Sequence, residues 1–166
     1  MRLPVTLLLS AFLALPFALS AQIKSPDAFF PHQPGVQYTR HDQLTDYFEY
    51  LAANATQTMR LERYGMTNED RPLQVAYFSA PENMARLEQI RVNNLRLAGV
   101  ADGTPDLSNP IAIVWLSMSV HGNEASGSEC SPELAYRLAT QTDPQIREWL
   151  KNTVVVLDPS LNPDGY

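Results

Sequence analysis

Two nearly continuous apolar runs constrain the fold of this chain more than any other feature. They are IAIVWLSMSV at residues 111–120 and TVVVL at residues 153–157. Runs of this kind are typical of strands that a sheet buries on both faces. A helical segment separates them, because Asp143 can cap a helix that Pro144 begins. The order strand, helix, strand predicts an α/β fold with helices on the faces of a sheet.

The part of the chain before these runs has the pattern of a helix, a hairpin and a second helix. Asp42 can cap the first helix, whose apolar face is expected to hold Leu44, Tyr47, Phe48, Leu51 and Ala52. Residues 60–65 and 72–79 are expected to be strands joined by the turn MTNEDR. Pro81 is expected to begin a helix that Gly99 ends.

The charge balance argues against one class of function. The 166 residues carry a formal net charge of −6, and no basic run occurs among them. Nucleic-acid binding depends on clustered lysine and arginine, so no nucleic-acid partner is expected. A single cysteine, Cys130, cannot form an internal disulfide bond. Its small and apolar neighbours favour a packing role over that of a nucleophile.

The N-terminal residues have the pattern of a targeting segment. Residues 1–21 combine a positive start at Arg2, an apolar stretch and small residues near Ser20, which is typical of a secretory signal peptide. An uncleaved membrane anchor is the alternative, which the short apolar span disfavours. The mature protein is therefore expected to be exported, periplasmic or extracellular, and free of the membrane after cleavage. Residues 22–40, rich in proline and aromatic residues, are expected to be an extended lead-in.

A histidine and a carboxylate follow the first apolar run three positions apart, as His121 and Glu124 in VHGNE. Ligands gather at the carboxyl ends of strands in open α/β sheets. Gly122 permits a turn there, and a turn that enters a helix brings positions i and i+3 to one side. An imidazole nitrogen and a carboxylate oxygen can then bind one Zn²⁺. On spacing alone, a structural histidine and a glutamate that favours a helix N-terminus are the more common arrangement.

The remaining candidate polar side chains are expected to be solvated, capping or turn-forming rather than catalytic. They are Glu129 and Glu133 after it, Asn162 and Asp164 after the second apolar run, and the upstream His32 and His41. Ser126 and Glu129 have the spacing of a capping box, which satisfies backbone N–H groups at a helix start. The two histidines are expected at the surface. Asn162 and Asp164 are expected to shape a turn, and the alternative is that they line the site.

Three motifs together resemble the carboxypeptidase A-like zinc carboxypeptidases. SMSVHGNEASGSE resembles the family's His-x-x-Glu zinc motif, and VVVLDPSLNPDGY is similar to its later strand and NPDG loop. Upstream, RYGMTNEDRPLQVAYFSAPEN resembles the turn G-x-S-x-x-G-R-P-L and the strand after it. Asp70 stands where that turn has its second glycine. If the position needs a positive φ, aspartate tolerates it better than most residues.

The resemblance implies a zinc-carboxypeptidase-like α/β/α sandwich, with a mixed and largely buried sheet and helices on both faces. It implies that His121 and Glu124 are two ligands of one zinc ion, and that the substrates are the C-termini of peptides or proteins. In the family, zinc activates a water molecule, a glutamate base takes its proton, and an arginine holds the substrate carboxylate.

In the family the third zinc ligand, a histidine, follows the NPDG loop, as do the general base and the arginine. No histidine follows His121 in this chain. We therefore expect no catalytic base within it and a third ligand beyond Tyr166. Residues 41–166 are expected to be the truncated N-terminal part of a catalytic domain. Alone, they are expected to bind zinc poorly and to have no peptidase activity.

Two alternatives remain open at this point. One is a zinc amidohydrolase or deacylase that acts on small acyl-amino acids or cell-wall peptides. The other is a non-catalytic exported binding domain that keeps the fold and has lost the site.

Overall fold

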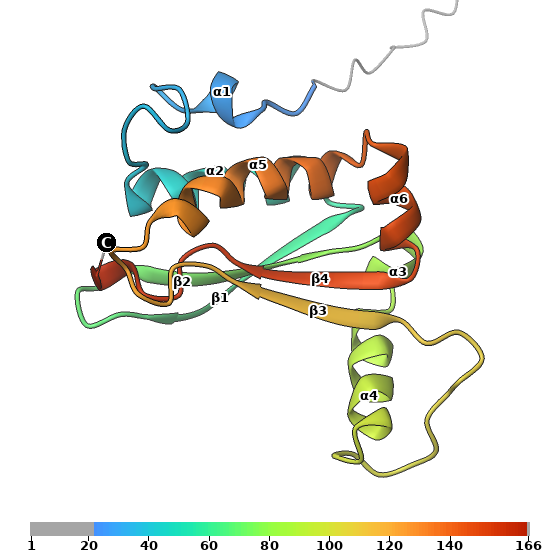
Figure 1. Ribbon diagram of the computed structural model, residues 1–166. Helices are drawn as coiled ribbons and strands as arrows, with labels where there is room; N and C mark the ends of the chain where they lie inside the picture. Colours follow the sequence, from blue (N-terminus) through green and yellow to red (C-terminus); the bar gives the residue numbers. More distant parts are fainter. Residues whose placement is uncertain (1–21, 166) are drawn as a thin grey trace, which may run out of the picture.

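A mixed four-stranded sheet forms the centre of the computed structural model, which describes residues 22–165 (Figure 1). The strand order is β1-β2-β4-β3. The pairs β1–β2 and β2–β4 are antiparallel, and β3 runs parallel to β4. The strands are β1 (Met59–Met66), β2 (Pro72–Phe78), β3 (Ala112–Ser117) and β4 (Thr153–Asp158). The predicted hairpin is therefore confirmed, with β1 and β2 extending over nearly the expected residues.

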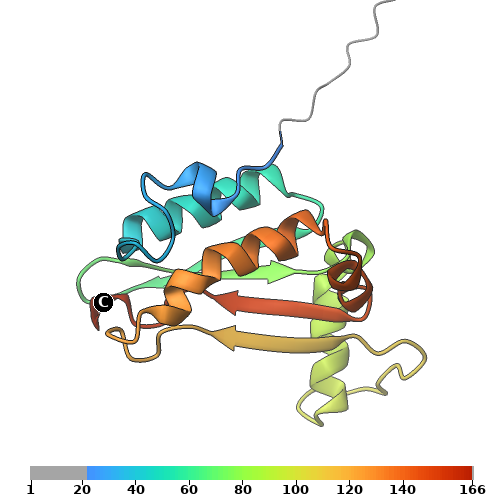
Figure 2. The same cartoon turned by 45° about the horizontal axis from the view of Figure 1, so that its top comes forward.

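Helices lie on both sides of this sheet. Figures 1 and 2 show α2 and α5 side by side over one face, while α4 lies beneath the opposite face at one end. The helices are α1 (Pro26–Phe29), α2 (His41–Asn54), α3 (Pro81–Met84), α4 (Leu87–Leu97), α5 (Ser126–Thr140) and α6 (Pro144–Leu150), and the 3-10 helix η1 spans Pro163–Gly165. Asp143 caps α6 as predicted, because its side chain accepts a hydrogen bond from the Gln145 N–H.

The main core fills the space between the sheet and the helices α2 and α5. The predicted apolar face of α2 is confirmed, since Tyr47, Phe48 and Leu51 have no exposed surface. They belong to one buried cluster with Phe78 of β2 and Leu157 of β4. A smaller cluster joins Ile90 of α4 to Val154, Ile111 and their neighbours under the other face. The fold thus confirms a mixed sheet with helices on both faces.

The helix expected to run from Pro81 to Gly99 is two helices. The chain leaves helical geometry at Arg86, where φ is −130° and ψ is 27°. The buried Asn83 accounts for the break, because its side-chain amide donates hydrogen bonds to the carbonyl groups of Leu150 and Lys151. This anchors the turn of α3 beside the end of α6, and α4 then departs in a new direction (Figure 1).

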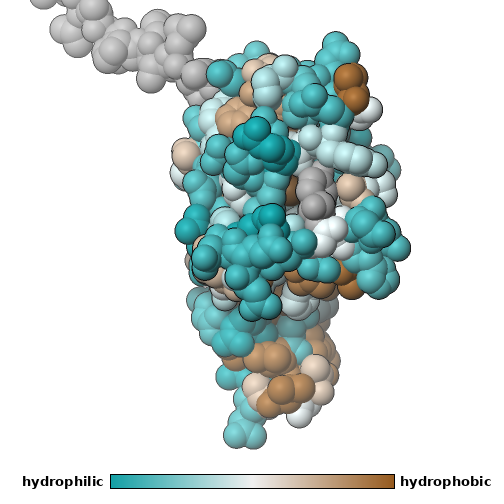
Figure 3. Space-filling model, turned by 90° about the vertical axis from the view of Figure 1, so that its left-hand side faces the viewer, coloured by the Kyte–Doolittle hydropathy of each residue, from teal (hydrophilic) through white to brown (hydrophobic). Residues whose placement is uncertain are grey.

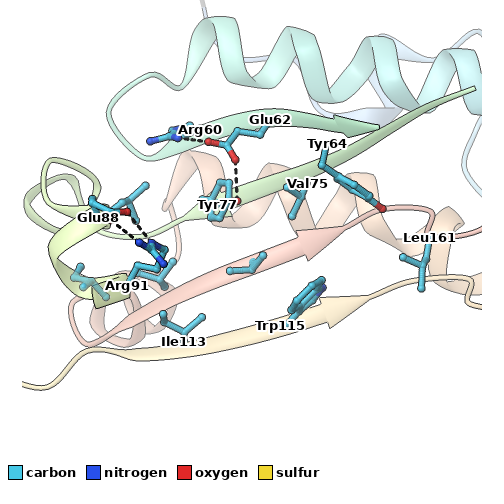
Figure 4. A pocket seen from close by; sticks show the side chains of 14 residues that line it. Arg60, Glu62, Tyr64, Val75, Tyr77, Glu88, Arg91, Ile113, Trp115 and Leu161 are labelled. Atoms are coloured by element: carbon cyan, nitrogen blue, oxygen red, sulfur yellow. Dashed lines mark hydrogen bonds and ion pairs between the residues drawn. The ribbon is translucent and has the colours of Figure 1, made fainter. Parts of the chain in front are cut away.

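Strand β3 is exposed, and the prediction that it is covered on both faces was wrong within residues 22–165. Trp115 exposes 67% of its surface, and Ile113 and Val114 are also exposed. The reason is its place at the edge of the described sheet, with only the distant α4 under one face. A groove of about 710 Å³ runs along that face, and Ile113, Trp115 and Tyr77 line it (Figure 4). The central β4 is mostly buried, as expected.

The lead-in packs against the domain and includes the one-turn helix α1, so it is not fully extended as predicted. Tyr50 accepts a hydrogen bond from the Lys24 N–H, and Tyr47 donates one to the Lys24 carbonyl. Phe30 is buried against Tyr47. The predicted signal peptide at residues 1–21 lies outside the described residues. Within residues 22–165, no helix has the length and apolar character needed to cross a bilayer.

Candidate metal centre

His121 and Glu124 lie in the turn between the carboxyl end of β3 and the start of α5. The Glu124 N–H donates to the His121 carbonyl over 2.9 Å, which closes the turn. This brings both side chains to one side, and His121 Nδ1 lies 3.1 Å from Glu124 Oε2. Their side chains expose 73% and 67% of their surface. Figure 3 views the molecule from this end of the sheet, where the surface is largely hydrophilic.

The donor atoms of this pair fit a zinc ion. Zinc binds histidine nitrogen and carboxylate oxygen at about 2.1 Å in a tetrahedron, which puts two ligand atoms about 3.4 Å apart. The observed separation of 3.1 Å is close to this value. Among residues 22–165, no group of three histidine, cysteine, aspartate or glutamate side chains is placed to hold a metal. The described part of the chain therefore brings two donors together.

The turn that carries the pair is in direct backbone contact with the loop after β4. A Cβ atom at Gly122 would lie 2.3 Å from the Gly165 carbonyl carbon and 2.6 Å from the Asn162 carbonyl oxygen. Gly122 is not among the residues with positive φ, so the contact alone requires glycine. The HGNE turn and the NPDG loop are thus fitted against each other without side chains between them.

Asp164 joins the NPDG loop to the turn between β1 and β2. Its carboxylate accepts hydrogen bonds from Thr67 Oγ1 at 2.6 Å, from Arg71 Nη1 at 2.9 Å and from the Glu69 N–H at 3.3 Å. The hydrogen bond from Thr67, helped by Arg71, lowers the pKa of Asp164. The prediction that Asp164 shapes a turn is confirmed. Asp70 has a φ of 58°, which confirms that its position requires a residue tolerant of positive φ.

The sequence profile described as zinc carboxypeptidase matches residues 44–166 of the chain. The chain belongs to the zinc carboxypeptidase family. The predicted family is thereby confirmed, and the match includes the HGNE turn, the NPDG loop and the β1–β2 hairpin. The family implies zinc as the metal at a site of this kind.

Solved structures share the fold of this zinc carboxypeptidase domain at low sequence identity. Carboxypeptidase A from Helicoverpa armigera matches 78% of this chain and 26% of its own, with a TM-score of 0.56 and 14% identity. Bovine thrombin-activatable fibrinolysis inhibitor, in complex with tick carboxypeptidase inhibitor, matches 78% and 33%, with a TM-score of 0.53 and 15% identity. A metallo-carboxypeptidase from Burkholderia cenocepacia matches 75% and 27%, with a TM-score of 0.52 and 20% identity.

The chain therefore spans about a quarter to a third of the length of these solved structures. No curated protein matches it significantly. The likeness to the solved structures concerns the fold, and the zinc role of His121 and Glu124 stays a prediction. In the zinc carboxypeptidase fold of this chain, the pair lies where the α/β rule places ligands, at the carboxyl end of a strand.

Sequence reasoning missed a buried carboxylate close to the NPDG loop. Asp158 ends β4 and exposes only 1% of its surface. Tyr64 donates a hydrogen bond to it over 2.6 Å, and the Ser160 N–H donates another. Burial raises the pKa of Asp158, although both hydrogen bonds act in the opposite direction. The position of this aspartate, directly after the apolar residues VVVL, could have predicted its burial.

Replacing Tyr64 with phenylalanine is expected to raise the pKa of Asp158 further, because the carboxylate loses a donor. Asp158 has a higher pKa in the folded protein than in the unfolded chain. Ionised Asp158 therefore lowers the stability of the folded protein at a pH above the folded pKa, and this loss of stability disappears as the pH falls through the folded pKa. The variant should therefore be destabilised by about 1 kcal/mol at neutral pH and by less in acid. Carboxyl NMR titration and urea unfolding at two pH values check this. An unchanged Asp158 pKa would contradict it.

Several secondary predictions also needed correction. Cys130 is exposed and not packed in the core. His32 and His41 are half-buried rather than at the surface, because His32 stacks on Phe30 and His41 Nε2 lies 2.8 Å from the Pro72 carbonyl oxygen. Glu129 is bound to the lead-in, since its carboxylate accepts hydrogen bonds from the N–H and hydroxyl of Thr39. No side chain caps the start of α5, so the predicted capping box does not form.

Proposed function

We propose that this chain carries two zinc ligands, His121 and Glu124, of an exported metallocarboxypeptidase that removes C-terminal residues from peptides. The observation that supports this most is the convergence of the two side chains, with a nitrogen and an oxygen 3.1 Å apart, in a chain of the zinc carboxypeptidase family. The expected export rests on residues 1–21 alone.

In peptide hydrolysis, the role proposed for this chain is to bind the metal ion. When bound, zinc polarises the scissile carbonyl group and lowers the pKa of a coordinated water molecule. His121 would hold the metal through an imidazole nitrogen and Glu124 through a carboxylate oxygen. Both side chains are exposed at the end of the sheet. A peptide can therefore approach the pair without a rearrangement of the described residues.

Two protein ligands are one fewer than catalytic zinc sites use. We propose that the full-length protein supplies a third ligand, a general base and an arginine from outside residues 22–165. Residues 22–165 alone are therefore expected to bind zinc weakly and to leave peptides intact. Affinity should rise steeply once the third ligand is present, because a complete set of donors holds the metal in one geometry.

Peptide hydrolysis by the full-length protein tests this proposal. The substrates are a peptide with a free C-terminal carboxylate, the same peptide with a C-terminal amide, and an acyl-amino acid. We expect release of the last residue from the first only, and at least a hundredfold lower rate in His121→Ala, because the metal loses a ligand. The control is Glu133→Ala, which removes an exposed carboxylate from α5.

Each other outcome identifies a different function. Hydrolysis confined to the acyl-amino acid would replace the carboxypeptidase with a deacylase. A zinc-loaded protein that cleaves none of the three would point to a binding domain. Equal rates in His121→Ala and the unmodified protein would show that His121 holds no catalytic metal.

A further inference from the structure

Ser119 combines burial with an unfavourable backbone conformation just before the proposed zinc pair. It lies two positions ahead of His121, and its φ is 50°. Residues other than glycine, asparagine and aspartate rarely adopt this left-handed region. Ser119 exposes only 8% of its surface. Strain of this kind persists where surrounding contacts hold it, and such positions cluster at functional sites.

The hydrogen bonds of the Ser119 hydroxyl account for its strained backbone conformation. It donates a hydrogen bond to the Glu124 carbonyl oxygen over 3.0 Å. Ser119 Oγ also accepts a hydrogen bond from the Ser128 N–H at 3.3 Å, and it lies 2.8 Å from Ser128 Oγ. Ser128 Oγ also lies 2.8 Å from the Pro159 carbonyl oxygen, so its one proton is shared between two acceptors. Ser119 and Ser128 are both buried, and Ser128 exposes only 1% of its surface.

These contacts close a six-residue loop, residues 119–124, that contains both proposed ligands. The Glu124 N–H is bound to the His121 carbonyl, and the Glu124 carbonyl is bound to the Ser119 hydroxyl. Both backbone polar groups of Glu124 are therefore fixed from within the loop. The exposed side chains of His121 and Glu124 depend on this backbone for their relative position, because little surrounds them.

We propose that Ser119 is a positioning residue, which presets the backbone of Glu124 so that its carboxylate and His121 meet at one metal ion. The inference rests on the proposed function, since it requires zinc on His121 and Glu124. Serine suits the position because alanine keeps the strain without the hydrogen bond, and glycine removes the strain but also the hydroxyl. Loss of the hydroxyl is therefore expected to loosen the loop in either variant.

The test uses the full-length protein, stripped of metal, with variants Ser119→Ala and Ser119→Gly. The control is Ser131→Ala, since Ser131 is also a buried serine, in α5, and its hydroxyl donates a hydrogen bond to the Ser128 carbonyl. Zinc dissociation constants come from competition with a chelator, and Co²⁺ absorption reports coordination geometry. Urea unfolding of the metal-free proteins reports stability separately.

We expect both Ser119 variants to bind zinc about tenfold to a hundredfold more weakly, the range for residues that orient metal ligands. The Co²⁺ spectrum should change as well. Ser131→Ala should lose stability with zinc affinity unchanged. Ser119→Gly provides the test if Ser119→Ala fails to fold, because glycine adopts the positive φ without strain. Wild-type zinc affinity and Co²⁺ spectrum in Ser119→Gly would overturn the inference.

Zinc binding by His121→Ala separates the role of Ser119 from the zinc role of His121 and Glu124. If zinc affinity falls in His121→Ala but not in the Ser119 variants, only the role of Ser119 is overturned. If the unmodified protein binds no zinc, or binds it equally well as His121→Ala, the proposed function is overturned and the inference with it.

Discussion

Replacing Gly122 with alanine is expected to destabilise the protein by about 3 kcal/mol, at the upper end of the usual cost of overpacking. The new methyl group would lie 2.3 Å from the Gly165 carbonyl carbon and 2.4 Å from its Cα atom. No side-chain rotation relieves this overlap, since the opposing atoms are backbone. Either the HGNE turn or the NPDG loop must move, and the loop is held by three hydrogen bonds to Asp164.

Urea unfolding of the variant measures this effect, and zinc affinity of the full-length protein should fall with it because His121 flanks the displaced residue. Gly65→Ala is the matched control. A Cβ atom at Gly65 meets only the Leu73 side chain at 3.7 Å, which is an ordinary contact. A Gly122→Ala variant as stable as Gly65→Ala would show that the two loops are not in contact.

Replacing Phe48 with alanine is expected to cost about 3–5 kcal/mol, the range for removing a fully buried phenylalanine. Phe48 has no exposed surface, and it belongs to the cluster that joins α2 to the sheet and α5. The cavity left behind cannot close easily, because Phe78 and Leu157 are fixed within strands β2 and β4.

Thermal or urea unfolding checks the Phe48 prediction against Trp149→Ala. Trp149 is also an aromatic residue within a helix, but it exposes 58% of its surface. Its removal is expected to cost about 0.5 kcal/mol or less, as is usual for surface substitutions. Equal losses in the two variants would contradict the assignment of Phe48 to the core.

Local patterns predicted those features of the fold that depend on neighbours in sequence. The apolar spacing after Asp42 predicted the buried face of α2, because helical periodicity is a property of a few turns. The turn between β1 and β2 was predicted from the residues MTNEDR between two strand patterns, and Asp70 within it has the positive φ that aspartate tolerates. The convergence of His121 and Glu124 followed from a turn that enters a helix.

Local patterns could not predict features that depend on residues far apart in the sequence. The apolar letters of β3 do not reveal that it lies at the edge of the described sheet. The contact of Gly122 with Gly165 and the hydrogen bond from Tyr64 to Asp158 join segments far apart in sequence. The left-handed conformation of Ser119 was also hidden, because serine is not a residue that predicts a positive φ.

The zinc role of His121 and Glu124 is tested by counting the zinc ions that the full-length protein binds with and without these side chains. The measurement is metal analysis after exhaustive dialysis against a weak chelator, on the unmodified protein and on His121→Ala, Glu124→Ala and Glu133→Ala. We expect one zinc ion per chain in the unmodified protein and in Glu133→Ala, and almost none in the other two. Full zinc occupancy in His121→Ala and Glu124→Ala would contradict it.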